Sequence, residues 1–155
     1  DGRSVETTMG FSTADGLLMG TRTGAIDPGV LIALMRDEGL GAEGLEDLLY
    51  RRSGLLGISG LSSDMRELLA SPAAEAADAV NAYCYQAARY AGSLAVAIDG
   101  IDAIVFTGGI GENAELVRRK ILAQLSFLGL SANDVYVVRA NEELTIARHV
   151  SALLR

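Results

Sequence analysis

The chain has 155 residues, half of them hydrophobic, which is enough to bury a substantial core and favours a single domain. Its 20 acidic and 13 basic residues give a net charge of −7, which excludes a basic surface for nucleic acid and disfavours anionic membranes as partners. No apolar stretch approaches the roughly 20 residues of a membrane-spanning helix, and the single cysteine, Cys84, allows no internal disulfide. These features predict a soluble protein and suit the reducing cytoplasm.

The first residues contain neither an initiator Met nor the regions of a signal peptide, so we interpret the sequence as part of a longer chain. Residues 4–8 alternate weakly and predict a short strand. Residues 9–26 are irregular and rich in glycine, and Arg22 is their only basic residue. The threonines and glycines around it let an anion approach the backbone, and a guanidinium fork suits a carboxylate or phosphoryl group. A surface arginine on a loop is the commoner alternative.

Three helices are predicted from caps and periodicity. Asp27 and Pro28 match the N-cap and first position of a helix that ends at Gly39, and a second short helix runs from about residue 43 to 51. The longest helix covers residues 72–98, with apolar residues at near-3.6 spacing. Its many alanines let another helix approach closely, either within the domain or across a dimer contact, and we expect burial within the domain.

A glycine-punctuated stretch, residues 53–69, leads into another capped helix. Ser62 or Ser63 is the expected N-cap, with Asp64 in the first turn, where the helix dipole favours a carboxylate. Capping alone accounts for serine and aspartate at these positions. It leaves Arg66 unexplained.

Residues 103–107 form an apolar, β-branched run that predicts a strand covered on both faces. The glycines that follow free the backbone for a sharp turn against a ligand, and Glu112 and Asn113 open the next helix, a geometry suited to a nucleotide or phosphate. Equally, glycines here serve any tight strand-to-helix connection. The motif is neither a Walker A loop nor a dinucleotide fingerprint.

The end of the chain predicts a helix over residues 115–128, a strand over 135–138 and a terminal helix capped by Asn141. In the last helix Leu144, Ile146 and Ala147 are expected to face inward, and two glutamates complement the dipole. The basic triplet of the preceding helix is interpreted as a solvated face: Arg118, Arg119 and Lys120. No residues form a supported Ser/His/Asp or Cys/His arrangement, so covalent hydrolase chemistry is not expected.

Four separated stretches together resemble the acetokinase family, the kinases of acetate, propionate and butyrate. They are TTMGFSTADGLLMGTRTGAIDP, SGLLGISGLSSDMRELL, DAIVFTGGIGEN and NEELTIAR. The stretches occur in the family's order and cover most of the chain, and acetate kinases are the most similar group. The resemblance implies an α/β fold, a ribonuclease H-like lobe of the actin-like ATPase superfamily that is incomplete at its N-terminal edge. Residues 1–155 would form the C-terminal nucleotide-binding lobe of a two-domain kinase, expected to work as a homodimer in the cytoplasm.

The resemblance also implies a reaction and its residues. The family transfers phosphoryl between ATP and a carboxylate with magnesium, here ATP and acetate, giving acetyl phosphate and ADP reversibly. Arg22 would act at the transferring phosphoryl group, and Glu142 would bear on Mg²⁺. The nucleotide would be held by two groups of residues: Asp64, Met65 and Arg66 at the adenosine, and Gly109, Ile110, Gly111 and Asn113 in the glycine motif.

The sequence departs from the family in two places. The family's N-terminal domain and its glycine hairpin do not precede Asp1, and the join over residues 130–135 is shorter than the family's loop. This chain alone is therefore expected to be inactive. A non-catalytic nucleotide-binding or dimerisation module is the alternative function, whereas a Rossmann-type reductase is disfavoured, because its acidic residue and G-x-G-x-x-G turn are missing.

Overall fold

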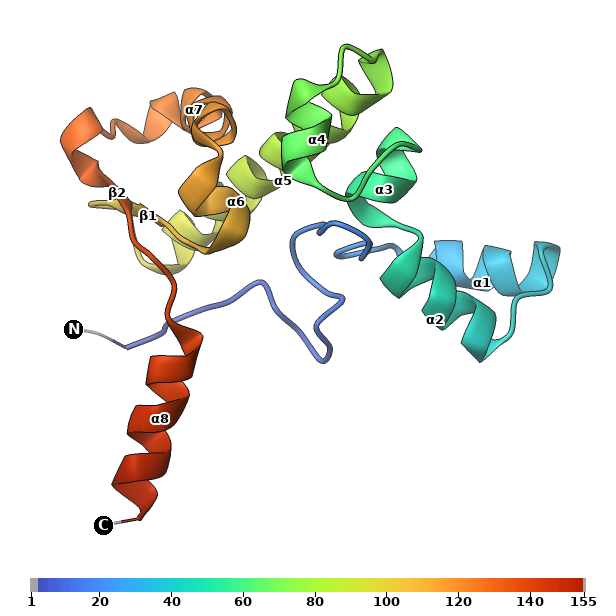
Figure 1. The fold of residues 1–155 in the computed structure, drawn as a ribbon, viewed down its shortest axis with the longest axis horizontal. Coiled ribbons are helices and arrows are strands. Elements are labelled where there is room, and N and C mark those ends of the chain that lie inside the picture. Colours follow the sequence, from blue (N-terminus) through green and yellow to red (C-terminus); the bar gives the residue numbers. More distant parts are fainter. Residues whose placement is uncertain (1–2, 155) are drawn as a thin grey trace.

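A computed structural model describes residues 3–154 (Figure 1). Helices dominate it, and the two strands are short. In chain order the elements are α1 (Pro28–Asp37), α2 (Ala42–Arg51), α3 (Gly54–Ser59), α4 (Met65–Ala70), α5 (Ala74–Ala97), β1 (Ile104–Phe106), α6 (Gly108–Asn113), α7 (Glu115–Gln124), the 3₁₀ turns η1 (Ser126–Leu128) and η2 (Ala132–Asp134), β2 (Val135–Val137) and α8 (Glu142–Leu153).

The long helix α5 is the centre of the core, and α3, α4 and α7 pack against it. Its buried face is mostly alanine, which lets the three neighbouring helices approach closely. The predicted burial of this helix within the domain is confirmed. The buried side chains that join these helices include Leu55, Met65, Leu68, Val80, Cys84, Val117 and Ile121.

β1 and β2 form a two-stranded parallel sheet in which Ile104 pairs with Val135 and Phe106 with Val137. Only one face of β1 is covered: Ile104 and Phe106 pack against the core, whereas Val105 is 57% exposed. The prediction of a strand buried on both faces is therefore wrong for this chain. An apolar run indicates that burial of a strand is favourable. Whether its second face is covered depends on other elements that pack there, which the sequence of the strand does not contain.

The glycine motif folds as a short helix, α6, and not as the open turn that its composition predicted. Gly108 begins the helix with a positive φ of 73°, which glycine adopts without strain. At the other end, the Arg118 guanidinium donates to the carbonyls of Gly111 and Glu112, both at 2.9 Å. Arg118 thus satisfies carbonyls that the helix end leaves free, and its prediction as a merely solvated residue is wrong.

The two ends of the described chain differ most from expectation. Residues 4–8, predicted as a strand, have no regular structure. Asn141 caps α8 as predicted, since its side chain accepts from the Leu144 amide. However, α8 projects away from the other helices (Figure 1), and none of its residues is buried. The side chains predicted to face inward are exposed: Leu144, Ile146 and Ala147.

No helix within residues 3–154 combines the length and apolar character needed to cross a bilayer.

The predicted cap of α1 is confirmed, whereas the predicted cap of α4 is wrong. Asp27 accepts from the Gly29 amide at the start of α1. At α4 the cap is Asp64 itself, and neither Ser62 nor Ser63.

Candidate functional site

Two of the predicted site segments meet in one pocket. The pocket has a volume of about 700 Å³ and lies between the start of α4 and the α6–α7 corner. This volume is within the range of small-molecule sites. Its lining contains six of the seven residues expected to bind nucleotide, together with three that were not expected to bind it: Ser63, Asp64, Met65, Arg66, Leu69, Gly109, Ile110, Asn113 and Ala114.

The α4 side of the pocket carries a charged pair. The Asp64 carboxylate accepts from the Arg66 amide at 2.8 Å, which caps the helix, and also receives the Arg66 guanidinium, with Nη2 at 2.5 Å from Oδ2. Because the guanidinium donates to it, the pKa of Asp64 falls from 3.8 to about 2. The Arg66 side chain is 85% exposed, so its planar fork is oriented by Asp64 while one face stays open. This pairing accounts for the arginine that capping left unexplained.

The α6 side of the pocket is mostly backbone. A Cβ built on Gly109 meets nothing within 4 Å, so the main chain here is open to a ligand. Asn113 donates from Nδ2 to the Gly109 carbonyl at 2.8 Å, which fixes the amide at the pocket rim. Gly111 does not line the pocket, because its missing side chain faces Phe106.

Arg22 lies outside this pocket, at the tip of a tightly bonded loop formed by residues 16–25. The Ala25 amide donates to the Gly16 carbonyl at 2.9 Å and closes the loop, while the Met19 amide donates to the Arg22 carbonyl at 3.0 Å. The loop also bonds to the α2–α3 connection, where the Ser53 amide donates to the Thr21 carbonyl, and to α3, whose Leu55 amide donates to the Met19 carbonyl. These bonds hold the backbone of the loop in one conformation.

The side chain of Arg22 has few contacts of its own. Its Nη1 is 3.4 Å from the Thr13 carbonyl, and the guanidinium carbon lies 5.7 Å from the ring centre of Tyr50. Neither contact is an ion pair, and within residues 3–154 no carboxylate lies within salt-bridge distance of Arg22. The charge is therefore uncompensated by the part of the chain that the structure describes.

Glu142 begins α8 and is also separate from the pocket. It is exposed, and no cluster of three potential metal ligands occurs within residues 3–154. A link to the glycine helix exists through Glu112, whose Oε1 accepts from the Gly108 amide and from the Ala140 amide. The prediction that Glu112 opens a helix is wrong, because Glu112 lies at the end of α6. Its bond to the Ala140 amide joins residues 28 positions apart, which no local pattern predicts.

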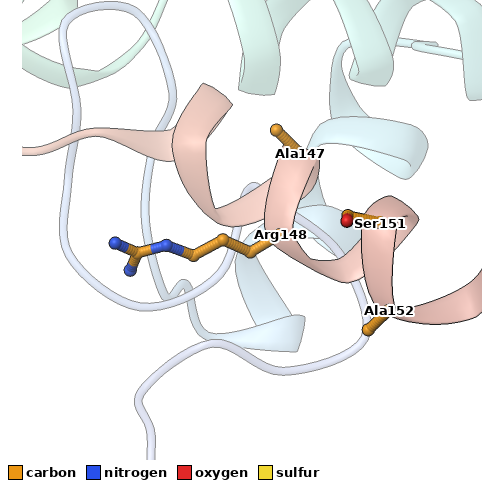
Figure 2. A pocket seen from close by; sticks show the side chains of 4 residues that line it. All are labelled: Ala147, Arg148, Ser151 and Ala152. Atoms are coloured by element: carbon orange, nitrogen blue, oxygen red, sulfur yellow. The ribbon is translucent and has the colours of Figure 1, made fainter. Parts of the chain in front are cut away.

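A further hollow, of about 500 Å³, lies on α8. Figure 2 shows its lining side chains, all from this one helix: Ala147, Arg148, Ser151 and Ala152. A surface formed by successive turns of a projecting helix does not enclose a ligand, so we do not treat it as a site.

Comparison with solved structures identifies the fold. The structure matches the acetate kinase of Porphyromonas gingivalis and a propionate kinase of Francisella tularensis, each with a TM-score of 0.88 and 36% sequence identity. The matches cover 96% and 95% of this chain and 43% of each of those chains. The chain is thus an α/β lobe of the actin-like ATPase superfamily.

Sequence comparison gives the family. The model of the acetokinase family matches residues 1–152, and the acetate kinase of Rhodopseudomonas palustris strain TIE-1 is 46% identical over 168 residues, covering 96% of this chain. That of Nitrobacter hamburgensis is 46% identical over 171 residues. The chain belongs to the acetokinase family.

The chain spans 42% of the length of these two relatives. Both alignments are longer than the 155 residues of the chain, so the relatives contain residues that have no counterpart in it. This agrees with a shortened segment somewhere in the chain. The position expected for it, residues 130–135, stays a prediction.

Proposed function

We propose that the protein carrying this chain is an acyl kinase that transfers phosphoryl reversibly between ATP and acetate, giving acetyl phosphate and ADP. The chain would supply the nucleotide-binding lobe, as its C-terminal part. The observation that carries the proposal is the pocket in which Asp64–Arg66 and Gly109–Asn113 meet, although more than 40 residues separate them in the sequence. The family membership of the chain supports the reaction, and the identity to acetate kinases supports acetate as the acceptor.

Adenosine is proposed to lie between the two sides of the pocket. The exposed Arg66 guanidinium, held by Asp64, presents a flat cationic face on which a base can stack. The open backbone at Gly109 admits close approach, and the Asn113 amide lies at the rim, where a sugar or phosphate would be. Gly111 belongs to the same helix but faces Phe106, so it would contact the nucleotide only through its backbone.

Arg22 is proposed to stabilise the phosphoryl group during transfer. A loose phosphoryl transition state spreads negative charge over its equatorial oxygens, so fixed positive charge and positioning carry the catalysis. Arg22 has the required properties, because its backbone is held by the loop and no carboxylate within the described residues neutralises it. A general base is not needed for this step.

The residues of the chain fit a magnesium ion bound mainly through nucleotide phosphates. Magnesium keeps several waters and usually takes one or two protein carboxylates, and Glu142 provides one that makes no ion pair within residues 3–154. When bound, the ion neutralises phosphate charge. Glu142 would hold it directly or through water, while Glu143 serves the helix dipole.

Three further features are proposed on the same basis. The functional unit is a homodimer, the partners are a small carboxylate and a nucleotide and include neither nucleic acid nor membrane, and the location is the cytoplasm. The net charge of −7 supports the absence of nucleic acid and anionic membrane among the partners. Sedimentation of the full-length protein tests the dimer directly.

The test of the function uses the full-length protein that carries this sequence. We expect ATP-dependent formation of acetyl phosphate, and ADP binding measurable by calorimetry in the presence of Mg²⁺. Gly109→Val projects a side chain into the open pocket and should weaken ADP binding at least about tenfold. The matched control is Gly92→Val on α5, where a new Cβ would meet only the exposed Phe127, at 3.9 Å.

Unchanged ADP affinity in Gly109→Val would remove α6 from the site. Nucleotide binding without any acyl phosphate formation would favour the non-catalytic binding module.

A further inference from the structure

Two polar side chains of α5 reach across to the loop that carries Arg22. The Gln86 side-chain oxygen accepts from the Leu18 amide at 2.5 Å, and the Tyr90 hydroxyl donates to the Gly16 carbonyl at 3.1 Å. Gln86 and Tyr90 are four residues apart, so they project from the same face of the helix one turn apart. They bond the backbone of the loop at two points only two residues apart.

These two bonds lie at the base of the loop. The Gly16 carbonyl also accepts from the Ala25 amide, which closes residues 16–25, and a Cβ on Gly24 would lie 2.6 Å from that same oxygen. Gly24 has a φ of 73°, so a glycine is required both for conformation and for space. The position of the base therefore sets the position of the whole loop, including Arg22.

The bonds are costly to lose. Leu18 is 6% exposed, so its amide has no ready access to water when the Gln86 oxygen is removed. The helix that provides the two side chains is itself held firmly, because α3, α4 and α7 all pack on it. Of these helices, α4 lines one side of the pocket, and α7 packs against α6, which lines the other side. Helix α5 thus contacts both the Arg22 loop and the helices around the pocket, and so sets their relative position.

We propose that Gln86 and Tyr90 are positioning residues that hold the Arg22 loop at a fixed position relative to the nucleotide pocket. The inference rests on the proposed function, since this position matters only if Arg22 acts on a phosphoryl group of the bound nucleotide. Displacements of about 1 Å reduce enzymatic rates by about a hundredfold. Loss of either bond therefore lowers kcat, with little effect on nucleotide affinity, because neither residue lines the pocket.

The experiment measures single variants and one double-mutant cycle in the full-length protein. Tyr90→Phe removes only the hydroxyl, and we expect kcat to fall at least about tenfold with the KM for ATP within about twofold. Gln86→Leu should behave alike, whereas Gln86→Glu keeps an acceptor for the Leu18 amide and should retain most of the rate. The control is Tyr85→Phe, which removes the hydroxyl of an exposed tyrosine on the same helix.

The decisive comparison uses an Arg22→Ala background. If Tyr90 acts through Arg22, Tyr90→Phe causes no further loss of kcat there. An equal fractional loss of kcat in both backgrounds, or no loss in either, would overturn the inference. If Gln86→Leu does not fold, Tyr90→Phe and Gln86→Glu still test it.

The proposed function and this inference fail in different ways. A wild-type protein that forms no acyl phosphate would overturn the function and with it the catalytic consequence of the two bonds. Hydrogen exchange then tests the bonds by themselves. An unchanged exchange rate of the Leu18 amide in Gln86→Leu would overturn the anchoring of the loop.

Discussion

The carboxylate of Glu112 connects to Ala140, 28 residues further along the chain, through a hydrogen bond of 2.8 Å from the Ala140 amide. The same oxygen accepts from the Gly108 amide at 2.9 Å. One side chain therefore joins the first residue of α6 to the segment that leads from β2 into α8. The Val138 amide, which donates to the Phe106 carbonyl, continues the sheet up to this point. Glu112 extends the connection between the strands beyond the last backbone pair.

Replacing Glu112 tests this connection. Glu112→Ala leaves two amides without their acceptor, and we expect a loss of about 1–3 kcal/mol in the free energy of unfolding. Urea denaturation measures the loss, and hydrogen exchange at Ala140 should accelerate. Glu115→Ala is the control, since that glutamate is 73% exposed and has only a 3.9 Å contact with Arg119. Equal stability of the two variants would contradict the assignment.

Gly54 is predicted to be intolerant of any side chain. It has a φ of 63°, and a Cβ there would overlap the Met19 carbonyl oxygen and lie 2.7 Å from that of Arg22. Gly54→Ala should cost at least about 1–3 kcal/mol through backbone strain alone and displace the Arg22 loop. Gly41→Ala is the control, because a Cβ at Gly41 meets open space at a negative φ. Thermal unfolding measures the loss of stability in both variants. A Gly54→Ala protein as stable as wild type would contradict the close packing.

Arg22 is predicted to act on the rate and not on nucleotide binding. Arg22→Ala in the full-length protein should lower kcat by on the order of 10³ or more, as for arginine fingers, with ATP affinity nearly kept. Arg22→Lys should recover little, since an ammonium group cannot reproduce the guanidinium fork. The control is Arg36→Ala, whose guanidinium pairs on the surface with Asp37. A folded Arg22→Ala protein with near-normal kcat would make Arg22 an ordinary loop arginine.

Glu142 is predicted to affect the dependence of the rate on magnesium. Glu142→Gln keeps the shape of the side chain and removes its charge, so a higher Mg²⁺ concentration should be needed for half-maximal rate. Glu143→Gln is the matched control, because both residues lie in the first turn of α8. If the magnesium dependence is unchanged while unfolding becomes easier, Glu142 serves only the helix dipole.

The Asp64–Arg66 pair predicts a pH dependence of stability. The pKa of Asp64 in the folded protein is about 2, below its ordinary 3.8, because Arg66 donates to the ionised carboxylate. A lowered folded pKa gives stabilisation that is present above about pH 4 and lost as the pH falls toward 2. Asp64→Asn keeps a capping oxygen but does not titrate.

Urea denaturation at several pH values checks this dependence. The advantage of wild type over Asp64→Asn should shrink as the pH falls from 4 toward 2, and added salt should reduce it at the higher pH, because the pair is exposed. Other carboxyls with lowered pKa, such as Asp37, are common to both proteins and cancel in the comparison. A difference that is independent of pH would show that the charge of Asp64 contributes nothing.

Helix positions and caps could be predicted because they depend on residues within one or two turns of each other. Asp27 and Asn141 cap the predicted helices, and the alanine face of α5 is buried as its periodicity indicated. The same local reasoning failed for the glycine motif. Composition indicated freedom of the backbone at Gly108, but the carbonyl bonds from Arg118 and the contact with Glu112 favour a helical turn.

The sequence by itself determined which residue types were available for a site: an isolated arginine among glycines, a capped Asp-x-Arg start and a glycine-rich helix. Only the tertiary structure decided that Asp64 and Gly109 share a pocket, while Arg22 and Glu142 lie outside it. The reason is that the pocket depends on how α4 and α7 pack against α5, and these contacts join residues remote in the sequence. Likewise, an apolar pattern on α8 or in β1 indicates only that burial is favourable. Whether Ile146 or Val105 is covered depends on what packs against it, and within the described chain nothing does so sufficiently to bury either side chain.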